Sequence, residues 1–430
     1  MSAEPKPMAP AWTDADARGA LRHLFDVAVA SADPAVMLAR HLPAKPAGRC
    51  IVVGAGKAAA SMAQAVDIAW PDVELTGAVV VPYGYGLSAG RIAVREAAHP
   101  VPDPASEAAA REILDLVARL SPDDLVLVLI SGGGSSVMAL PAPGITLSDK
   151  QEVSRLLLAS GLDIRTMNVV RRRMSAIKGG KLLAAAQPAR VVTLAISDIP
   201  GDDVASIASG PSIPDSTADV DLGHVVALLG AQLPAAVTAR LLAPAEARVT
   251  SADCDVRLIG TPAAALDAAA AAARCVGLHP VLLGDDLEGE SHVLGAEMAT
   301  LAQRGVVVPT VFLSGGETTV TLAGRACGRG GRNTEFALAL ACALDGDDGI
   351  WALAADTDGE DGASRAAGAM IGPDTIARAA AATLDARSYL AAHDSATLFD
   401  ALGDLLLTGP TRTNVNDFRA VLVLPQEMQR

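Results

Sequence analysis

Short apolar runs alternate with longer stretches of helical periodicity along the first half of the chain. The runs are bounded by Gly, Pro or Asp, and several lead directly into sequence with helical spacing: 50–53, 77–81, 125–130 and 191–196. Repetition of strand, loop and helix is typical of a mostly parallel sheet with helices on both faces. The pattern therefore predicts a Rossmann-like α/β domain over residues 15–240.

The same pattern begins again after a segment rich in Pro and Ala. Residues 241–252 show little periodicity and are predicted to form a linker. Beyond them we expect a helix at 262–275 and strands at 256–259, 307–313, 350–354 and 420–424. This predicts a smaller C-terminal α/β domain over residues 253–424. Because ligands of open α/β sheets bind beyond the carboxyl ends of the strands, we expect the site residues in the loops that follow the strands. We also expect the active site to lie in a cleft between the two domains.

The composition and net charge of the chain indicate which kinds of binding partner to expect. Hydrophobic residues make up 51% of the chain, and the formal net charge of -15 opposes binding to nucleic acid or to an anionic membrane. The N-terminus lacks the pattern of a signal peptide, and no charge-free apolar run of membrane-spanning length occurs, so we expect a cytoplasmic protein. The oligomeric state stays open, with a homodimer as one alternative. The five cysteines are odd in number and form no CxxC pair, which suits a reducing compartment: Cys50, Cys254, Cys275, Cys327 and Cys342.

Two glycine-rich segments follow strands of the first predicted domain. The sequence GAGKAA places Gly54 and Gly56 in a tight turn and Lys57 at a helix start. It fits a dinucleotide-binding turn, a turn that presents Lys57 to an anionic substrate, or a packing turn with a solvated lysine. The dinucleotide alternative lacks the acidic residue expected at the end of the next strand, which reads VPYG. The second segment, SGGGSS, can cradle phosphates with backbone N–H groups and hydroxyls: Ser131, Gly132, Gly133, Gly134 and Ser135.

Charged residues gather near these loops. Basic residues run from Arg171 to Lys181 and include Lys178 among glycines, which is either a solvated face or an anion contact. The sequence SDIPGDD places Asp198 and two further carboxylates after a strand, and such a cluster suits Mg²⁺. In the second half, DTDGEDG offers Asp358 and Asp361 as further metal candidates, although the pattern is not an EF-hand.

Arginine among glycines marks another candidate site in the second predicted domain. The stretch from Ser314 to Glu335 places Arg325 and Arg332 before a helix, an arrangement that can clamp a carboxylate or phosphate. The polar residues around it complete the candidate binding set: Gly315, Gly316, Glu317, Asn333 and, near the C-terminus, Asn416.

Taken in order, these segments resemble the glycerate 2-kinase family, whose C-terminal portion is known as the MOFRL domain and whose members were often labelled hydroxypyruvate reductases. The motifs that carry the resemblance are SGGETTVTLAGRACGRGGRNTEFALALA, ADTDGEDG and TGPTRTNVNDF, supported by HPVPD and SDIPGDD. It covers residues 20–424 and implies transfer of a phosphoryl group from ATP, with Mg²⁺, to the 2-hydroxyl of D-glycerate.

The resemblance also implies roles for individual residues. Lys57 and Arg332 would act on the anionic reactants, Asp198 would lie beside the substrate or metal, and the SGGGSS loop would contact nucleotide phosphates. Two departures occur: the family usually has Gly where Arg412 stands and Asn where His393 stands. Two other functions compete, an NAD(P)H-dependent hydroxypyruvate reductase and a non-enzymatic binding protein for organic acids.

Overall fold

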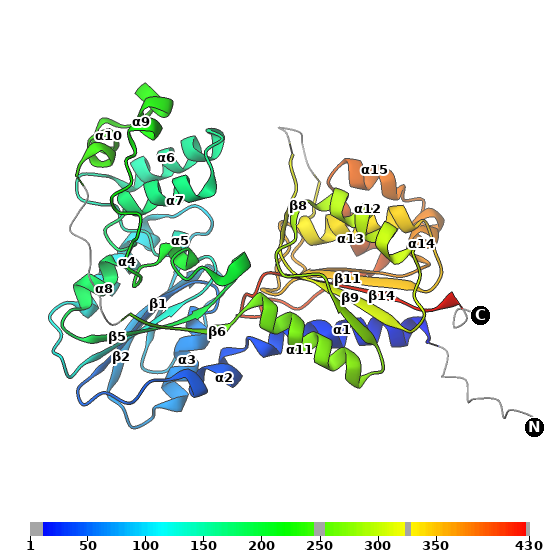
Figure 1. Ribbon diagram of the computed structural model, residues 1–430, viewed down its shortest axis with the longest axis horizontal. Helices are drawn as coiled ribbons and strands as arrows, with labels where there is room; N and C mark the ends of the chain where they lie inside the picture. The colour runs from blue at the N-terminus through cyan, green and yellow to red at the C-terminus, as the bar shows by residue number, and fades with distance from the viewer. Residues whose placement is uncertain (1–11, 245–253, 323–327, 427–430) are drawn as a thin grey trace, which may run out of the picture. The chain divides into compact units, whose positions relative to one another are not determined.

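The computed structural model describes residues 12–244, 254–322 and 328–426 (Figure 1). Most of the predicted linker at 241–252 lies outside these ranges. The chain divides into two compact units. The first unit comprises Ala32–Thr261 and Arg412–Val415, and the second comprises the described residues of Met1–Ser31, Pro262–Thr411 and Asn416–Arg430. Among the described helices, none is both long enough and apolar enough to cross a membrane.

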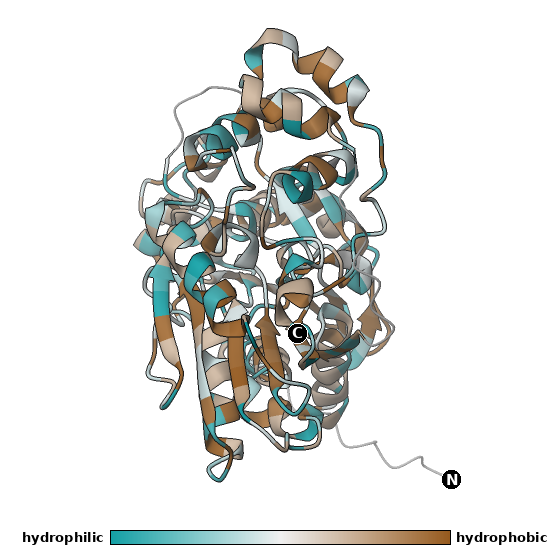
Figure 2. Ribbon diagram, turned by 90° about the vertical axis from the view of Figure 1, so that its left-hand side faces the viewer, coloured by the Kyte–Doolittle hydropathy of each residue, from teal (hydrophilic) through white to brown (hydrophobic). Residues whose placement is uncertain are grey.

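The first unit is built on a six-stranded, entirely parallel sheet. Its central strands are buried along their whole length, which is why they read as unbroken apolar runs such as LVLVLI. Figure 2 shows these hydrophobic strands beside helices of mixed hydropathy. In spatial order the strands are β3 (Ala93–Ala97), β2 (Leu75–Pro82), β1 (Cys50–Ala55), β4 (Leu125–Ile130), β5 (Arg190–Ile196) and β6 (Asp255–Gly260).

Helices cover both faces of this sheet (Figure 1). One face carries α4 (Pro104–Val117), α5 (Gly134–Val137) and α8 (Lys181–Ala186), and the other carries α3 (Ala59–Ala69). A capping box fixes the start of α4, where Asp103 Oδ1 accepts a 3.0 Å hydrogen bond from the Ser106 amide. The shorter elements of this part of the unit are α2 (Pro34–Met37), η1 (Leu38–His41), η2 (Pro200–Asp202) and η3 (Ile207–Ser209).

A separate helical cluster extends the first unit. It has a hydrophobic core of its own, which includes Val153, Leu157, Val170 and Val225. Its helices are α6 (Leu147–Ala159), α7 (Ile164–Arg173), α9 (Gly223–Leu229) and α10 (Ala235–Leu242), with η4 (Gly230–Gln232).

The second unit contains a six-stranded mixed sheet in which only the β7–β9 pair is parallel among the described strands. In spatial order its strands are β13 (Leu405–Leu406), β12 (Gly368–Ile371), β11 (Ile350–Asp356), β14 (Asp417–Val423), β9 (Thr310–Ser314) and β7 (His279–Leu282). A short parallel pair, β8 (Glu288–Glu290) and β10 (Glu317–Thr319), lies outside this sheet.

Helices also cover both faces of the mixed sheet (Figure 1). One face carries α1 (Asp14–Ser31) and α11 (Pro262–Cys275). The opposite core is built around α13, which is buried over nearly all of its length. The helices on that side are α12 (Ser291–Ala302), α13 (Arg332–Leu344), α14 (Thr375–Ala381), α15 (Ala386–Ala391) and α16 (Ser395–Leu402).

Two elements lie in a different unit from the one that the chain pattern suggested. The strand expected at 256–259 is β6, and it pairs with β5 at the edge of the first sheet rather than joining the second domain. Helix α1, expected in the first domain, packs against β14 and α11 of the second unit. The position of an element along the chain does not determine which sheet it joins. The pairing of an edge strand and the packing of an N-terminal helix both depend on residues that are distant in sequence.

Candidate functional site

Two loops meet at the carboxyl ends of β1 and β4 in the first unit. The Lys57 amide donates a 2.8 Å hydrogen bond to the carbonyl of Gly132, and the Ala58 amide donates to Ser131 Oγ at 2.9 Å. A Cβ on Gly56, which has φ +124°, would lie 2.4 Å from the carbonyl oxygen of Ser131. Gly56 therefore allows close packing between the two loops, and this packing fixes the backbone at Lys57.

Asp198 lies directly against the SGGGSS loop. A Cβ on Gly132 would be 1.8 Å from Asp198 Oδ2 and 2.5 Å from Asn414 Nδ2, so any side chain there would displace both groups. The Asn414 amide donates a 2.9 Å hydrogen bond to Asp198 Oδ2. The carboxylate is thus held on the loop by a glycine and an asparagine that lie far apart in the sequence.

The ring of His99 faces the same loop. His99 Nδ1 lies 2.7 Å from Ser136 Oγ, and the His99 ring is 3.5 Å from the Cβ that a side chain at Gly133 would carry. Partial desolvation of the ring, helped by the charge of Lys57, lowers the pKa of His99 to about 4. His99 is therefore neutral at physiological pH and suits a hydrogen-bonding role better than that of a base.

Lys178 contacts the far side of the SGGGSS loop. Its Nζ donates hydrogen bonds to the carbonyl of Ser135 at 2.5 Å and to Ser135 Oγ at 2.7 Å, and Ser135 Oγ lies 2.9 Å from Ser209 Oγ. Burial, with the charges of Lys150 and Arg171, lowers the pKa of Lys178 well below its ordinary value. Of the two interpretations of this basic run, a solvated face does not hold for Lys178, which is 4% exposed.

In the second unit, Arg332 opens α13 and contacts three carboxylates. Its Nε donates to Asp417 Oδ1 at 2.9 Å and its Nη2 donates to Asp356 Oδ2 at 2.9 Å, while Nη1 pairs with Glu317. Although burial opposes it, the charges of Asp417, Asp356 and Glu317 raise the pKa of Arg332 above its ordinary value. The guanidinium is therefore the centre of an ion network, and its contact with a reactant stays a prediction.

Neighbouring side chains extend this network into the core. Asn333 Nδ2 also donates to Asp417 Oδ1, at 2.7 Å. On its other oxygen Asp417 accepts a 2.5 Å hydrogen bond from Arg419, which is fully buried over the ring of Phe336. Asp417 and Arg419 are both buried away from water, so each depends on the other as its charged partner.

Asp361 caps α13. Its two oxygens accept hydrogen bonds of 2.8–2.9 Å from the amides of Asn333 and Thr334 and from Thr334 Oγ1. Burial raises the pKa of Asp361 to about 6, although these hydrogen bonds oppose the shift. These hydrogen bonds satisfy the buried carboxylate of Asp361 within the protein. Metal binding by Asp361 stays a prediction, and its contacts give no support for it.

The other predicted residues of this unit serve the turns around the network. Gly316 has φ +96°, and a Cβ there would lie 2.2 Å from the carbonyl oxygen of Leu287, while Gly315 accepts a hydrogen bond from Arg419. Asp358 is fully buried and its Oδ1 accepts a 2.8 Å hydrogen bond from the Glu360 amide. The carbonyl of Asn416 accepts a 2.6 Å hydrogen bond from Thr357 Oγ1. Arg325 lies outside the described residues.

The two departures from the family pattern have local consequences. Arg412 has φ +62°, a left-handed conformation that favours glycine, and its carbonyl accepts a 2.7 Å hydrogen bond from Ser61 Oγ. His393 also has a positive φ, of 52°, and its Nδ1 lies 2.8 Å from the buried carboxylate of Glu335.

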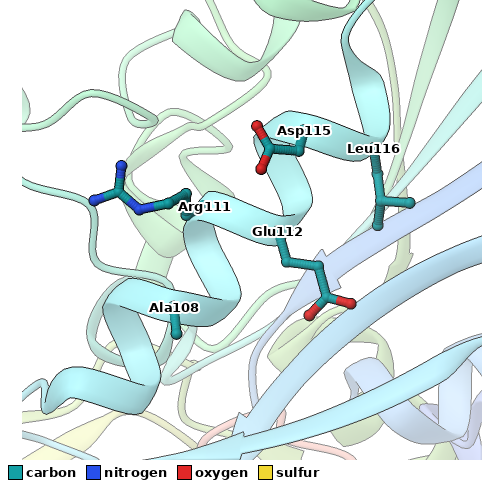
Figure 3. A pocket seen from close by; sticks show the side chains of 5 residues that line it. All are labelled: Ala108, Arg111, Glu112, Asp115 and Leu116. Atoms are coloured by element: carbon teal, nitrogen blue, oxygen red, sulfur yellow. The ribbon is translucent and has the colours of Figure 1, made fainter.

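Neither a metal cluster nor a described cavity coincides with the predicted residues. Within the described ranges, no group of three or more His, Cys, Asp or Glu side chains could hold a metal ion. An open cavity of about 540 Å³ lies against α4, and Figure 3 shows its five lining side chains. They include none of the predicted site residues: Ala108, Arg111, Glu112, Asp115 and Leu116.

Sequence reasoning missed several members of these networks. HPVPD signalled His99, and Asn414 lies in TNVND, yet neither was proposed as a site residue. Asp417 and Asp356 lie in quoted motifs, but no local pattern shows that both contact Arg332. Lys150 carried no signal, since a lysine in an amphipathic helix is ordinarily exposed.

Comparison with known proteins shows which families the chain is similar to. Residues 20–242 match the model of a domain of unknown function, DUF4147, and residues 310–417 match the MOFRL family. A protein of Agrobacterium vitis with the provisional name of hydroxypyruvate reductase is 53% identical over 96% of each chain. The D-glycerate 2-kinase of Thermotoga maritima is 36% identical, covering 89% of this chain and 93% of that protein.

A solved structure shares the architecture. The crystal structure of glycerate kinase from Thermotoga maritima superposes with a TM-score of 0.85 at 33% identity, covering 95% of this chain and 99% of that one. The chain is therefore an α/β protein of two compact units, similar in fold to this glycerate kinase. It belongs to the glycerate 2-kinase family.

Proposed function

We propose that this protein is a phosphotransferase that transfers the γ-phosphoryl group of ATP to the 2-hydroxyl of D-glycerate. One observation carries the proposal: the loops that hold Lys57 and Asp198 lie at the carboxyl ends of parallel strands, in a chain 36% identical to a D-glycerate 2-kinase. Phosphoryl transfer needs positioning, neutralisation of charge and removal of the hydroxyl proton.

The residues of the first unit suit these needs. Lys57 would supply positive charge to an anionic reactant, with its backbone fixed by the Gly132 carbonyl. Asp198, oriented by Asn414, would accept the proton of the 2-hydroxyl or hold a metal ion. The hydroxyls and amides of the SGGGSS loop would contact phosphate oxygens. In the second unit Arg332 would assist with an anionic reactant, provided that one of its carboxylate contacts is exchanged.

Mg²⁺ is proposed as the counterion of the nucleotide. It takes hard oxygen ligands, is commonly held by one or two carboxylates and retains waters and phosphate oxygens. Asp198 fits such a ligand because its carboxylate lies on the glycine-rich loop. When bound, Mg²⁺ would neutralise charge on the phosphate chain.

A coupled assay tests the proposal. Purified protein with ATP, Mg²⁺ and D-glycerate should form ADP and 2-phosphoglycerate in equal amounts, and product analysis should resolve it from 3-phosphoglycerate. A 3-phosphoglycerate product would contradict the position proposed, and absence of ADP formation would contradict the activity.

A second candidate function is NAD(P)H-dependent reduction of hydroxypyruvate. The name of the Agrobacterium vitis relative and the GAGKAA turn favour it. Against it, β2 ends at Pro82 without the acidic residue that a dinucleotide ribose requires, and Gly54 and Gly56 have packing roles. Oxidation of NADH or NADPH by hydroxypyruvate without ATP would establish the reductase and exclude the kinase as the principal activity.

A further inference from the structure

Three cations in the first unit are near enough for their charges to act on one another: Lys150, Arg171 and Lys178. Lys150 and Lys178 are 6% and 4% exposed, and Arg171 is half-buried beside them. Lys150 Nζ donates to the Met174 carbonyl at 3.4 Å, and Arg171 Nη1 donates to Asn168 Oδ1 at 3.1 Å. Among the residues that the structure describes, no carboxylate lies within ion-pair distance of any of the three.

Such a cluster is unfavourable in the ligand-free protein. A buried ammonium group loses hydration, and in proteins this loss is ordinarily offset by a carboxylate or avoided by release of a proton. Burial, with the charges of Lys181 and Arg171, lowers the pKa of Lys150 to about 8. The pKa of Lys178 is lowered for the same reasons, by burial and by the charges of Lys150 and Arg171. An anion bound among them would reverse both effects.

The cluster adjoins the glycine-rich loop of the candidate site. Lys178 holds Ser135 of that loop, and Ser135 Oγ in turn lies 2.9 Å from Ser209 Oγ. Ala208 and Ser209 both have positive φ, and the Gly179 and Gly180 amides donate to the carbonyls of residues 209 and 210. Lys178 therefore contacts one end of a loop whose other end, at Gly132, lies against Asp198.

We propose that Lys150, Lys178 and Arg171 form a subsite that binds a phosphate group of a substrate, with Ser135 as an additional hydrogen-bonding group. Three cations match a multiply charged phosphate better than the single charge of a carboxylate. The inference rests on the proposed kinase function, in which two molecules carry phosphate: the nucleotide and the phosphorylated product.

The test compares Lys150→Met with wild type. Methionine keeps an unbranched apolar side chain one atom shorter than that of lysine but removes the charge. Lys45→Met serves as control, because Lys45 is an exposed lysine paired with Asp72 at 2.6 Å. Calorimetry and thermal shift would measure binding of ADP, inorganic triphosphate, 2-phosphoglycerate and D-glycerate.

We expect Lys150→Met to melt no lower than wild type without ligand, yet to bind triphosphate at least tenfold more weakly. Lys178→Met should show the same loss of affinity, and Lys45→Met should show none. A loss for ADP and triphosphate but not for 2-phosphoglycerate would assign the subsite to the nucleotide, and the reverse would assign it to the product.

Affinity for every phosphate ligand within twofold of wild type in both Lys150→Met and Lys178→Met would overturn the subsite. Failure of the kinase function would be distinguishable: wild type would then form no phosphoglycerate, while triphosphate binding would still depend on these lysines.

Discussion

Asp198 occupies a position that three other residues define. Gly132 has no side chain to fill the position of the carboxylate, Asn414 donates to one of its oxygens, and Ser197, the residue directly before it, is fully buried. A carboxylate fixed in this way loses little freedom when a reactant binds, and such preorganisation is what transfer of a phosphoryl group requires. The side chain is therefore the first to test at the scale of single residues.

Asp198→Asn should lower kcat by at least two orders of magnitude while the protein remains folded. The amide keeps the shape of the side chain but can neither accept a proton nor provide a charged metal ligand. Steady-state kinetics with thermal melts would measure both effects. The control is Asp123→Asn in the same unit, where the carboxylate is exposed and lies outside the SDIPGDD cluster. A near-normal rate for Asp198→Asn would show that its role is structural.

Lys57→Ala should reduce kcat more than it raises KM. If its charge acts mainly as the transition state forms, its loss costs about 3 to 4 kcal/mol, or roughly two to three orders of magnitude in rate. The backbone of the turn is held through the Lys57 amide, so the alanine variant should keep its fold. Kinetics with ATP and D-glycerate varied separately would check this, and a rate within about threefold of wild type would contradict a catalytic role.

At the scale of elements, the N-terminus of α13 combines several functions in consecutive residues. Arg332 contacts carboxylates of β10, β11 and β14, while Asn333 and Thr334 are held by Asp361. The helix start is thereby connected to three strands. Substitution of Arg332 would disturb this framework as well as any contact with a reactant.

Arg332→Lys should therefore lose stability together with activity. An ammonium group cannot donate to three separated carboxylates as the guanidinium does, so buried Asp356 and Asp417 would lose partners, at a cost of roughly 3 kcal/mol. Urea unfolding and kinetics should be measured on the same preparations. Arg329→Lys is a suitable comparison, because Arg329 pairs with the exposed Asp400. Unchanged stability with lost turnover would indicate that Arg332 acts on a reactant alone.

The sequence predicted the elements better than it predicted their partners. The runs at 125–130 and 262–275 correspond to β4 and α11, because burial on both faces of β4 and the Ala-rich periodicity of α11 are local properties. The pairing of β6 with β5 and the contact of Asn414 with Asp198 depend on chain segments that are far apart. The order of the motifs along the chain therefore identified the candidate loops. The buried position of Lys150 depends on how the helices pack, which the sequence pattern does not show.

For the whole molecule, the net charge of -15 opposes the approach of ATP and glycerate alike. We expect the attraction to come from local cations and from Mg²⁺. Chelation of divalent metal should reduce turnover to background, and added Mg²⁺ should restore it. The melting temperature should not change, because no described cluster of three or more metal-ligand side chains could hold a structural ion. Turnover that persists in excess chelator would contradict the need for Mg²⁺.

The pH dependence of stability provides a test of the buried lysines that needs no substrate. The pKa of Lys150 is about 8 in the folded protein and near 10.5 in the unfolded chain. Between these values the unfolded chain binds more protons, so the contribution of Lys150 to stability rises with pH. Below pH 8 its charged form destabilises the ligand-free fold by roughly 3 kcal/mol, a cost that Lys150→Met removes. The variant should therefore exceed wild type in urea midpoint at pH 7, and the difference should shrink toward pH 10.5.

Saturating triphosphate should reverse the order of the two urea midpoints at pH 7, because the anion stabilises only the protein that carries the cation. Lys45→Met should follow wild type throughout, and a Lys150→Met difference that stays constant from pH 7 to 10 would contradict the buried charge.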